Sequence, residues 1–176
     1  MTSGRRSDDM ADHTLNDLNE ADEETFVDAL GDVYETSPWV AERVVADRPF
    51  DSVEDLHEHM AGAVRDASAE HKLALLRAHP DLGEQTEMTD ASEREQASAG
   101  LDELSPEQYE TFQRLNETYR DRFGFPFIMA VKGASPDEIQ AAMEERIDNS
   151  EATEFQTALD QVHEIARLRL EERFGE

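Results

Sequence analysis

Cysteine is absent from this 176-residue sequence, and lysine occurs only twice, at Lys72 and Lys132. The lack of cysteine excludes disulfide bonds, thiolate metal ligands and a cysteine nucleophile. No apolar run approaches the roughly 20 residues that a membrane-spanning helix needs. The first twelve residues are polar and contain none of the apolar segment of a secretory signal. The sequence therefore predicts a cytoplasmic protein with no membrane partner.

Positive charge is scarce as well, because 16 Lys and Arg stand against 43 Asp and Glu, a formal net charge of −27. Nucleic acids are not expected as partners, since phosphate binding needs clustered Lys and Arg. The acidic residues are spread along the chain. This pattern favours adaptation to high salt, where a Debye length of about 3 Å at 1 M screens their mutual repulsion. We predict a halophile protein; an acidic interaction protein is the alternative.

Apolar residues recur at spacings of three and four along most of the chain, which is typical of helices with one buried face. The pattern is clear near the C-terminus, at Phe155, Leu159, Val162, Ile165 and Ala166. We predict an all-α fold, with a single multi-helix domain over residues 13–176 after a disordered tail over residues 1–12. The length fits one domain.

Serine marks the predicted helix starts, because its hydroxyl caps free backbone N–H groups and a following proline suits the first turn. N-caps are predicted at Ser37, Ser52, Ser105 and Ser135. Ser92 and Glu95 fit a capping box. The polar stretch 81–91 is predicted to be a loop. The apolar run 125–131 is either a short buried strand or an irregular crossing of the core.

Several residues are candidates for chemistry. His79 lies between a helix end and the polar loop, and histidine is the usual general acid or base near neutral pH. Its alternative role is to complement the helix dipole. Glu95 has the capping box as its structural alternative. Arg167 and Arg169 lie among apolar residues of the last helix, so one lies nearer the core. We predict no metal site, because the single E-x-x-H motif that ends at His57 lacks the second copy that a di-iron bundle needs.

A series of short motifs resembles one family, the 2-oxo-4-hydroxy-4-carboxy-5-ureidoimidazoline (OHCU) decarboxylases of urate degradation. The motifs are Ser-Pro-Trp-Val-Ala from 37, His-Pro-Asp-Leu-Gly from 79, Ser-Glu-Arg-Glu-Gln from 92, Ser-Ala-Gly-Leu from 98 and Phe-Gly-Phe-Pro-Phe-Ile from 123. Further matches follow at Asn116, Tyr119, Arg146, Asn149, Glu154 and Arg169. Each motif alone is weak, but their order over residues 15–174 is specific.

The resemblance implies an all-helical, cofactor-free decarboxylase that forms a homodimer and produces (S)-allantoin. It implies that His79 and Glu95 are catalytic. It also implies substrate contacts by Pro80, Ser92, Gln96, Arg169 and the backbone of Phe127 and Ile128. The alternative is a binding module that keeps this fold without the activity.

Overall fold

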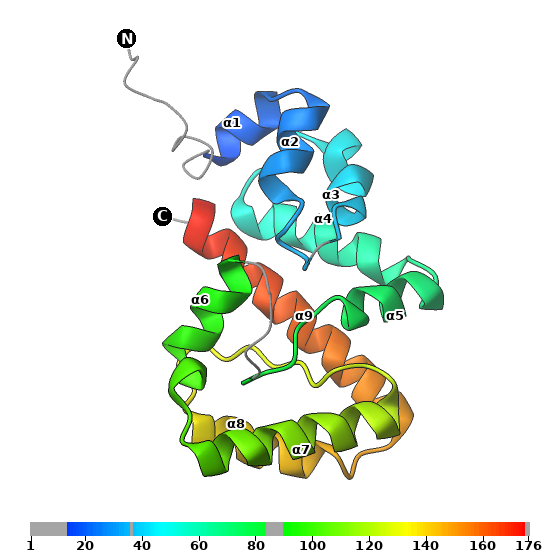
Figure 1. Cartoon of the computed structure of the whole chain (residues 1–176). Coiled ribbons are helices and arrows are strands. Elements are labelled where there is room, and N and C mark those ends of the chain that lie inside the picture. The colour runs from blue at the N-terminus through cyan, green and yellow to red at the C-terminus, as the bar shows by residue number, and fades with distance from the viewer. Residues whose placement is uncertain (1–13, 36, 84–89, 175–176) are drawn as a thin grey trace. The chain divides into compact units, whose positions relative to one another are not determined.

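The computed structural model describes residues 14–35, 37–83 and 90–174. Over these ranges the chain forms α-helices and short 3₁₀ turns and contains no strand, which confirms the predicted all-α class (Figure 1). None of the helices in the described ranges is long and apolar enough to cross a membrane. The α-helices are α1 (Leu15–Glu20), α2 (Glu23–Leu30), α3 (Trp39–Val44), α4 (Val53–Arg65), α5 (Ala69–Arg77), α6 (Asp90–Ser98), α7 (Pro106–Phe123), α8 (Pro136–Arg146) and α9 (Glu151–Phe174).

Contacts within the chain divide it into two compact units. The first comprises residues 1–72 and 163–176, and the second comprises residues 73–162. Helix α9 is continuous and contributes to both. The single domain over residues 13–176 stays a prediction, and the predicted tail over residues 1–12 lies outside the described residues.

Each unit buries its own set of apolar side chains. In the first, α3 packs against α2 and α4, and the buried residues include Leu18, Phe26, Leu30, Val40, Val44, Leu56, Met60, Val64 and Leu170. In the second, α8 packs against α7, and the buried residues include Leu75, Leu76, Phe112, Tyr119, Phe127, Ile139, Met143 and Val162. The apolar spacing that predicted the helices therefore matches the faces that the helices bury.

Three of the predicted serine caps are confirmed. The hydroxyl groups of Ser52, Ser105 and Ser135 accept the backbone N–H groups of Asp55, Gln108 and Glu138, three residues further on. Helix α7 ends at Phe123 and is capped by Gly124, whose φ of +83° suits glycine. These boundaries follow from local chemistry, so the sequence alone locates them.

Two predicted caps are wrong. Helix α3 has Pro38 at its N-cap position, and the Ser37 hydroxyl donates to the carbonyl of Glu35. Helix α6 begins at Asp90, so Ser92 is a buried residue inside its first turn rather than the cap. The predicted loop 81–91 therefore extends two residues too far, because Asp90 and Ala91 belong to α6. Residues 84–89 of the predicted loop lie outside the described residues. The error at Ser37 arises because a serine hydroxyl can bond to another backbone group where a neighbouring residue starts the helix.

The run 125–131 is an irregular crossing of the second unit's core rather than a strand (Figure 1). Its side chains at Phe125, Phe127, Ile128 and Val131 are buried. Because it lacks regular secondary structure, its backbone polar groups need partners from elsewhere in the unit. The Ala130 N–H donates to Oε1 of Gln161 at 2.9 Å, which supplies one of them.

Candidate active site

His79 closes the turn that follows α5. Its ring Nδ1 lies 2.9 Å from the carbonyl oxygen of Leu75, and only 8% of the residue is exposed. A carbonyl oxygen only accepts hydrogen bonds, so Nδ1 carries the hydrogen, and in neutral imidazole the lone pair lies on Nε2. The contact caps a carbonyl in the last turn of α5. It also fixes the tautomer that a general base at Nε2 needs.

Gln96 holds the turn after His79. Its Oε1 accepts the N–H of Gly83 at 3.0 Å, and its Nε2 donates to the carbonyl of Asp81 at 3.2 Å. Gln96 is buried on α6. An amide group has two N–H donors, so this structural role is compatible with the predicted substrate contact.

Helix α7 holds the same turn from a second direction. Nδ2 of Asn116 donates to the carbonyl of Leu82 at 2.9 Å. Gly83 has a φ of +82°, and a Cβ at this position would lie 2.9 Å from the ring of Phe112. Both backbone conformation and space therefore require glycine here. The turn after His79 is thus fixed by two helices.

Ser92 and Glu95 come from the same helix as Gln96. Residues three and four apart lie on one side of a helix, so α6 presents all three side chains together. Ser92 is buried and Glu95 is partly exposed. Because α6 begins at Asp90, Glu95 lies beyond the first turn. N-terminal capping therefore does not explain the glutamate at this position.

A cleft of about 330 Å³ opens beside His79. It is lined by Arg77, His79, Pro80, Asp81, Arg120, Gly124, Phe125 and Pro126. Arg120 forms an ion pair with Asp81, and the arginine side chain is half exposed while the aspartate is buried. Two guanidinium groups thus line this cleft, although the net charge of the chain is −27.

Arg77 and Arg120 were not among the predicted site residues. Arg77 donates from Nε to the carbonyl of Gly124 at 2.9 Å, which attaches the end of α5 to the end of α7. In the sequence, nothing distinguishes these two arginines from charged residues on the exposed face of a helix. Only the approach of α7 to the turn after His79 makes them part of the cleft.

Phe127 and Ile128, whose backbone is predicted to line the pocket, directly follow the cleft residues Phe125 and Pro126. Both are buried, with 0% and 2% of the residue exposed. Nη1 of Arg146 donates to the carbonyl of Ile128 at 2.8 Å. The second unit therefore contains every predicted site residue except Arg169.

Arg169 belongs to the first unit, where it is 2% exposed. Its Nη1 lies 3.0 Å from Oε1 of Glu35 and donates to the carbonyl groups of Asp32 and Val33. Arg167 is more exposed and pairs with acidic residues of its own helix. The expectation that one of the two arginines lies nearer the core is confirmed, and that arginine is Arg169.

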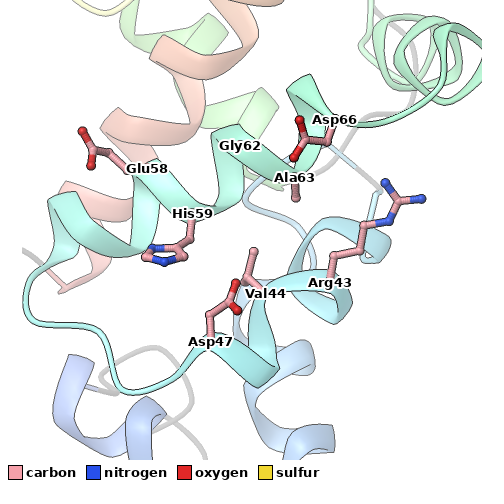
Figure 2. A pocket seen from close by; sticks show the side chains of 8 residues that line it. All are labelled: Arg43, Val44, Asp47, Glu58, His59, Gly62, Ala63 and Asp66. Carbon is pink, nitrogen blue, oxygen red and sulfur yellow. The ribbon is translucent and has the colours of Figure 1, made fainter.

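A second cleft, of about 610 Å³, lies between α3 and α4 of the first unit. Figure 2 shows the ring of His59 and the carboxylate of Asp47 on facing walls, with Arg43 and Asp66 toward the other end. Its charged groups have both signs, and none is a predicted site residue. Within the described residues, no cluster of three or more His, Asp or Glu has the geometry to hold a metal ion. We therefore centre the candidate site on the smaller cleft beside His79.

Comparison with known proteins gives one consistent family. The sequence model of the OHCU decarboxylases matches residues 19–171. The chain is 67% identical to a 2-oxo-4-hydroxy-4-carboxy-5-ureidoimidazoline decarboxylase of Haloferax volcanii, over 94% of this chain and 99% of the relative. It is 66% identical to a protein of the same description from Halalkalicoccus jeotgali, over 90% of each chain. A crystal structure of an (S)-allantoin synthase superimposes with a TM-score of 0.77 at 34% identity, over 92% of this chain and 54% of that one.

Proposed function

The chain belongs to the OHCU decarboxylase family, and on that premise we propose how its residues convert 2-oxo-4-hydroxy-4-carboxy-5-ureidoimidazoline to (S)-allantoin. The enzyme is a decarboxylase of urate degradation. The relatives from Haloferax volcanii and Halalkalicoccus jeotgali, which are halophilic archaea, confirm the halophile origin predicted from charge. The observation that carries the mechanism is the position of His79, held by the Leu75 carbonyl at the wall of a cleft that contains guanidinium groups.

The substrate supplies its own electron sink. It bears a carboxylate and a hydroxyl on a ring carbon next to a C=N bond. When the bond to the carboxylate breaks and CO₂ leaves, the electron pair forms a C=C bond and the C=N pair moves onto nitrogen, which takes a proton. We therefore propose that no cofactor takes part, because the ring already does what pyridoxal phosphate or thiamine diphosphate does elsewhere.

Two proton transfers remain for the protein. The hydroxyl group must lose its proton to become a carbonyl, and the neighbouring carbon must gain one on a single face. We assign this work to His79 and Glu95, since an imidazole with its lone pair on Nε2 is suited to accept the hydroxyl proton. Delivery to one face of the carbon gives the (S) product.

The remaining predicted residues orient the substrate. We propose that Pro80 and the backbone at Phe127 and Ile128 form walls, and that Ser92 and Gln96 hydrogen-bond to the ring and ureido group. Asp81 balances the charge of Arg120, so the guanidinium of Arg77 leaves the lining of the cleft net positive, which favours an anionic substrate. An arginine that gripped the departing carboxylate tightly would stabilise the ground state and oppose the reaction. The contact of Arg169 with a carbonyl or ureido oxygen of the substrate therefore stays a prediction from the family resemblance.

The test is product stereochemistry. Substrate is generated freshly by enzymatic oxidation of urate in high salt, and the chirality of allantoin is followed by circular dichroism. Fast accumulation of one enantiomer is the expected result. Allantoin that forms no faster than without protein, and without an enantiomeric excess, would instead support the inactive binding module.

We further propose that the enzyme is a cytoplasmic homodimer. The dimer rests on the family resemblance and on aromatic residues such as Trp39, which is only partly buried and carries the guanidinium of Arg43 over its ring at 4.7 Å. Sedimentation in high salt should give twice the chain mass of 19.9 kDa. A monomer at micromolar concentration would refute this state.

A further inference from the structure

A buried network of charged and polar side chains contacts the segment 125–131 and consists of Tyr119, Arg146, Asn149 and Glu154. At its centre is Glu154, whose exposed fraction is 0%. Its carboxylate accepts the hydroxyl of Tyr119, Nε of Arg146 at 2.9 Å and Nδ2 of Asn149 at 2.8 Å. Burial raises the pKa of Tyr119, and the bond to Glu154 raises it further, so the tyrosine stays a donor. Three donors thus hold one carboxylate inside the second unit.

Arg146 connects this carboxylate to the irregular segment. While its Nε binds Glu154, its Nη1 donates to the carbonyl of Ile128 at 2.8 Å. Its guanidinium also lies over the ring of Phe127, 4.4 Å from the ring centroid. One planar group therefore fixes the backbone carbonyl of one residue and the side chain of its neighbour.

The chemistry of this contact favours a role beyond stability. Burying an ion pair costs desolvation energy, and apolar replacements are often as stable. Nη2 of Arg146 is buried without a hydrogen-bond partner among the described residues, which is a further cost. The guanidinium is planar and rigid, so its two N–H donors hold the Glu154 carboxylate and the Ile128 carbonyl at fixed positions relative to each other.

We propose that Arg146 is a positioning residue for the reaction, which aims the Phe127–Ile128 backbone at the substrate and is itself oriented by Glu154. This inference rests on the proposed function, in which that backbone forms part of the substrate pocket. Positioning matters in such a site, since a displacement of about 1 Å can cost about 10²-fold in rate.

The test is the variant Arg146→Lys, which keeps the positive charge but loses the fork that reaches both acceptors. We expect kcat to fall by about 10- to 100-fold. We also expect the enantiomeric excess of allantoin to fall, because a loosened wall lets the intermediate be protonated on either face. The excess is compared at enzyme concentrations that give equal overall rates, so that spontaneous decarboxylation contributes equally.

Tyr119→Phe is the matched control. It removes one donor to Glu154 from the same buried network, keeps the ring that packs near Phe127, and leaves the bond from Arg146 to Ile128 in place. It should lower the melting temperature while kcat and enantiomeric excess stay unchanged. If both variants lose stereochemical control equally, the effect is general loosening of the core and the proposal is overturned.

Arg146→Lys with lowered melting temperature but wild-type kcat and stereochemistry would also overturn the proposal. Should that variant not fold, Glu154→Gln tests the same point, because it keeps an acceptor for Nε but removes the charge that orients the guanidinium. We expect smaller decreases in kcat and enantiomeric excess for Glu154→Gln than for Arg146→Lys. Wild-type kcat and enantiomeric excess in Glu154→Gln would refute the proposal. A wild-type protein that does not accelerate (S)-allantoin formation would instead refute the proposed function.

Discussion

Arg169 and Glu35 form an ion pair in which each side chain is only 2% exposed, with Nη1 of the arginine 3.0 Å from Oε1 of the glutamate. The same nitrogen donates to the carbonyl groups of Asp32 and Val33, 137 and 136 positions earlier in the sequence. Arg169 therefore has a structural role in the first unit, whatever it contributes to substrate binding. The two roles are separable by experiment.

Replacing Arg169 alone should destabilise the protein strongly. Arg169→Met removes the cation from a buried ion pair, which typically costs about 3–5 kcal/mol. The double variant Arg169→Met with Glu35→Leu removes both charges and should recover much of that loss, as judged by denaturant unfolding in high salt. If Arg169 also contacts substrate, the double variant will be folded but inactive. Full activity in the double variant would restrict Arg169 to its structural role.

His79→Asn should abolish catalysis without unfolding the protein. Asparagine keeps an N–H donor and tolerates a helix C-terminus, so the melting temperature should change little. Loss of a proton-transfer group typically lowers the rate by about 10²–10⁴-fold. The measurement is the rate of chiral allantoin formation from fresh substrate, with circular dichroism to verify the helices. Full activity in this variant would contradict the proposed mechanism.

Glu95→Gln tests the second member of the acid/base pair. Because α6 begins at Asp90, this glutamate has no capping role to lose, and glutamine keeps its size and one acceptor oxygen, so stability should change little. We expect activity to fall by about 10²-fold or more. Combining it with His79→Asn should cost little more, since residues that act as a unit are not additive. Glu93→Gln, at an exposed position of the same helix, is the control and should keep normal activity.

The lowered pKa of His57 should make the free energy of unfolding depend on pH. Its Nε2 lies 2.9 Å from the carbonyl of His163, and burial lowers its pKa below the usual value. The unfolded chain therefore binds more protons just below pH 6.5, and the contribution of His57 to stability is lost as the pH falls through its folded pKa. The stability difference between the wild type and His57→Gln should shrink from about pH 7.5 to 5. His71→Gln, at an exposed histidine of the same unit, controls for the loss of an imidazole, and a constant difference would contradict the assignment.

Salt should stabilise and activate the enzyme. With a net charge of −27, surface repulsion loosens the fold at low ionic strength, and it also repels an anionic substrate. The melting temperature and kcat/KM should both rise between about 0.1 M and 2 M KCl, as the Debye length shortens from about 10 Å to below 3 Å. A flat response in both quantities would contradict salt adaptation.

The sequence alone determined the helical class, the starts of α4, α7 and α8, and the family. Helix caps are local: Ser105 and its acceptor role toward Gln108 lie within four consecutive residues, so the pattern contains all the information that the structure uses. The family motifs are likewise contiguous runs. The position of His79 at a helix end followed from the proline after it.

The contacts that join distant parts of the chain depend on how the helices pack in three dimensions. These include the hydrogen bonds from the Gly83 N–H to Gln96 and from Arg146 to the Ile128 carbonyl, the ion pair of Arg120 with Asp81, and that of Arg169 with Glu35. In sequence, each of the side chains that form these contacts is a polar position on a helix or turn, and its partner, which for Gln96 and Arg146 is a backbone group, is set by how the helices pack. The run 125–131 was ambiguous for the same reason, because an apolar stretch becomes a strand only if another strand lies beside it. Here the carbonyl of Ile128 and the N–H of Ala130 bond to the side chains of Arg146 and Gln161 rather than to a neighbouring strand, and the run crosses the core without regular structure.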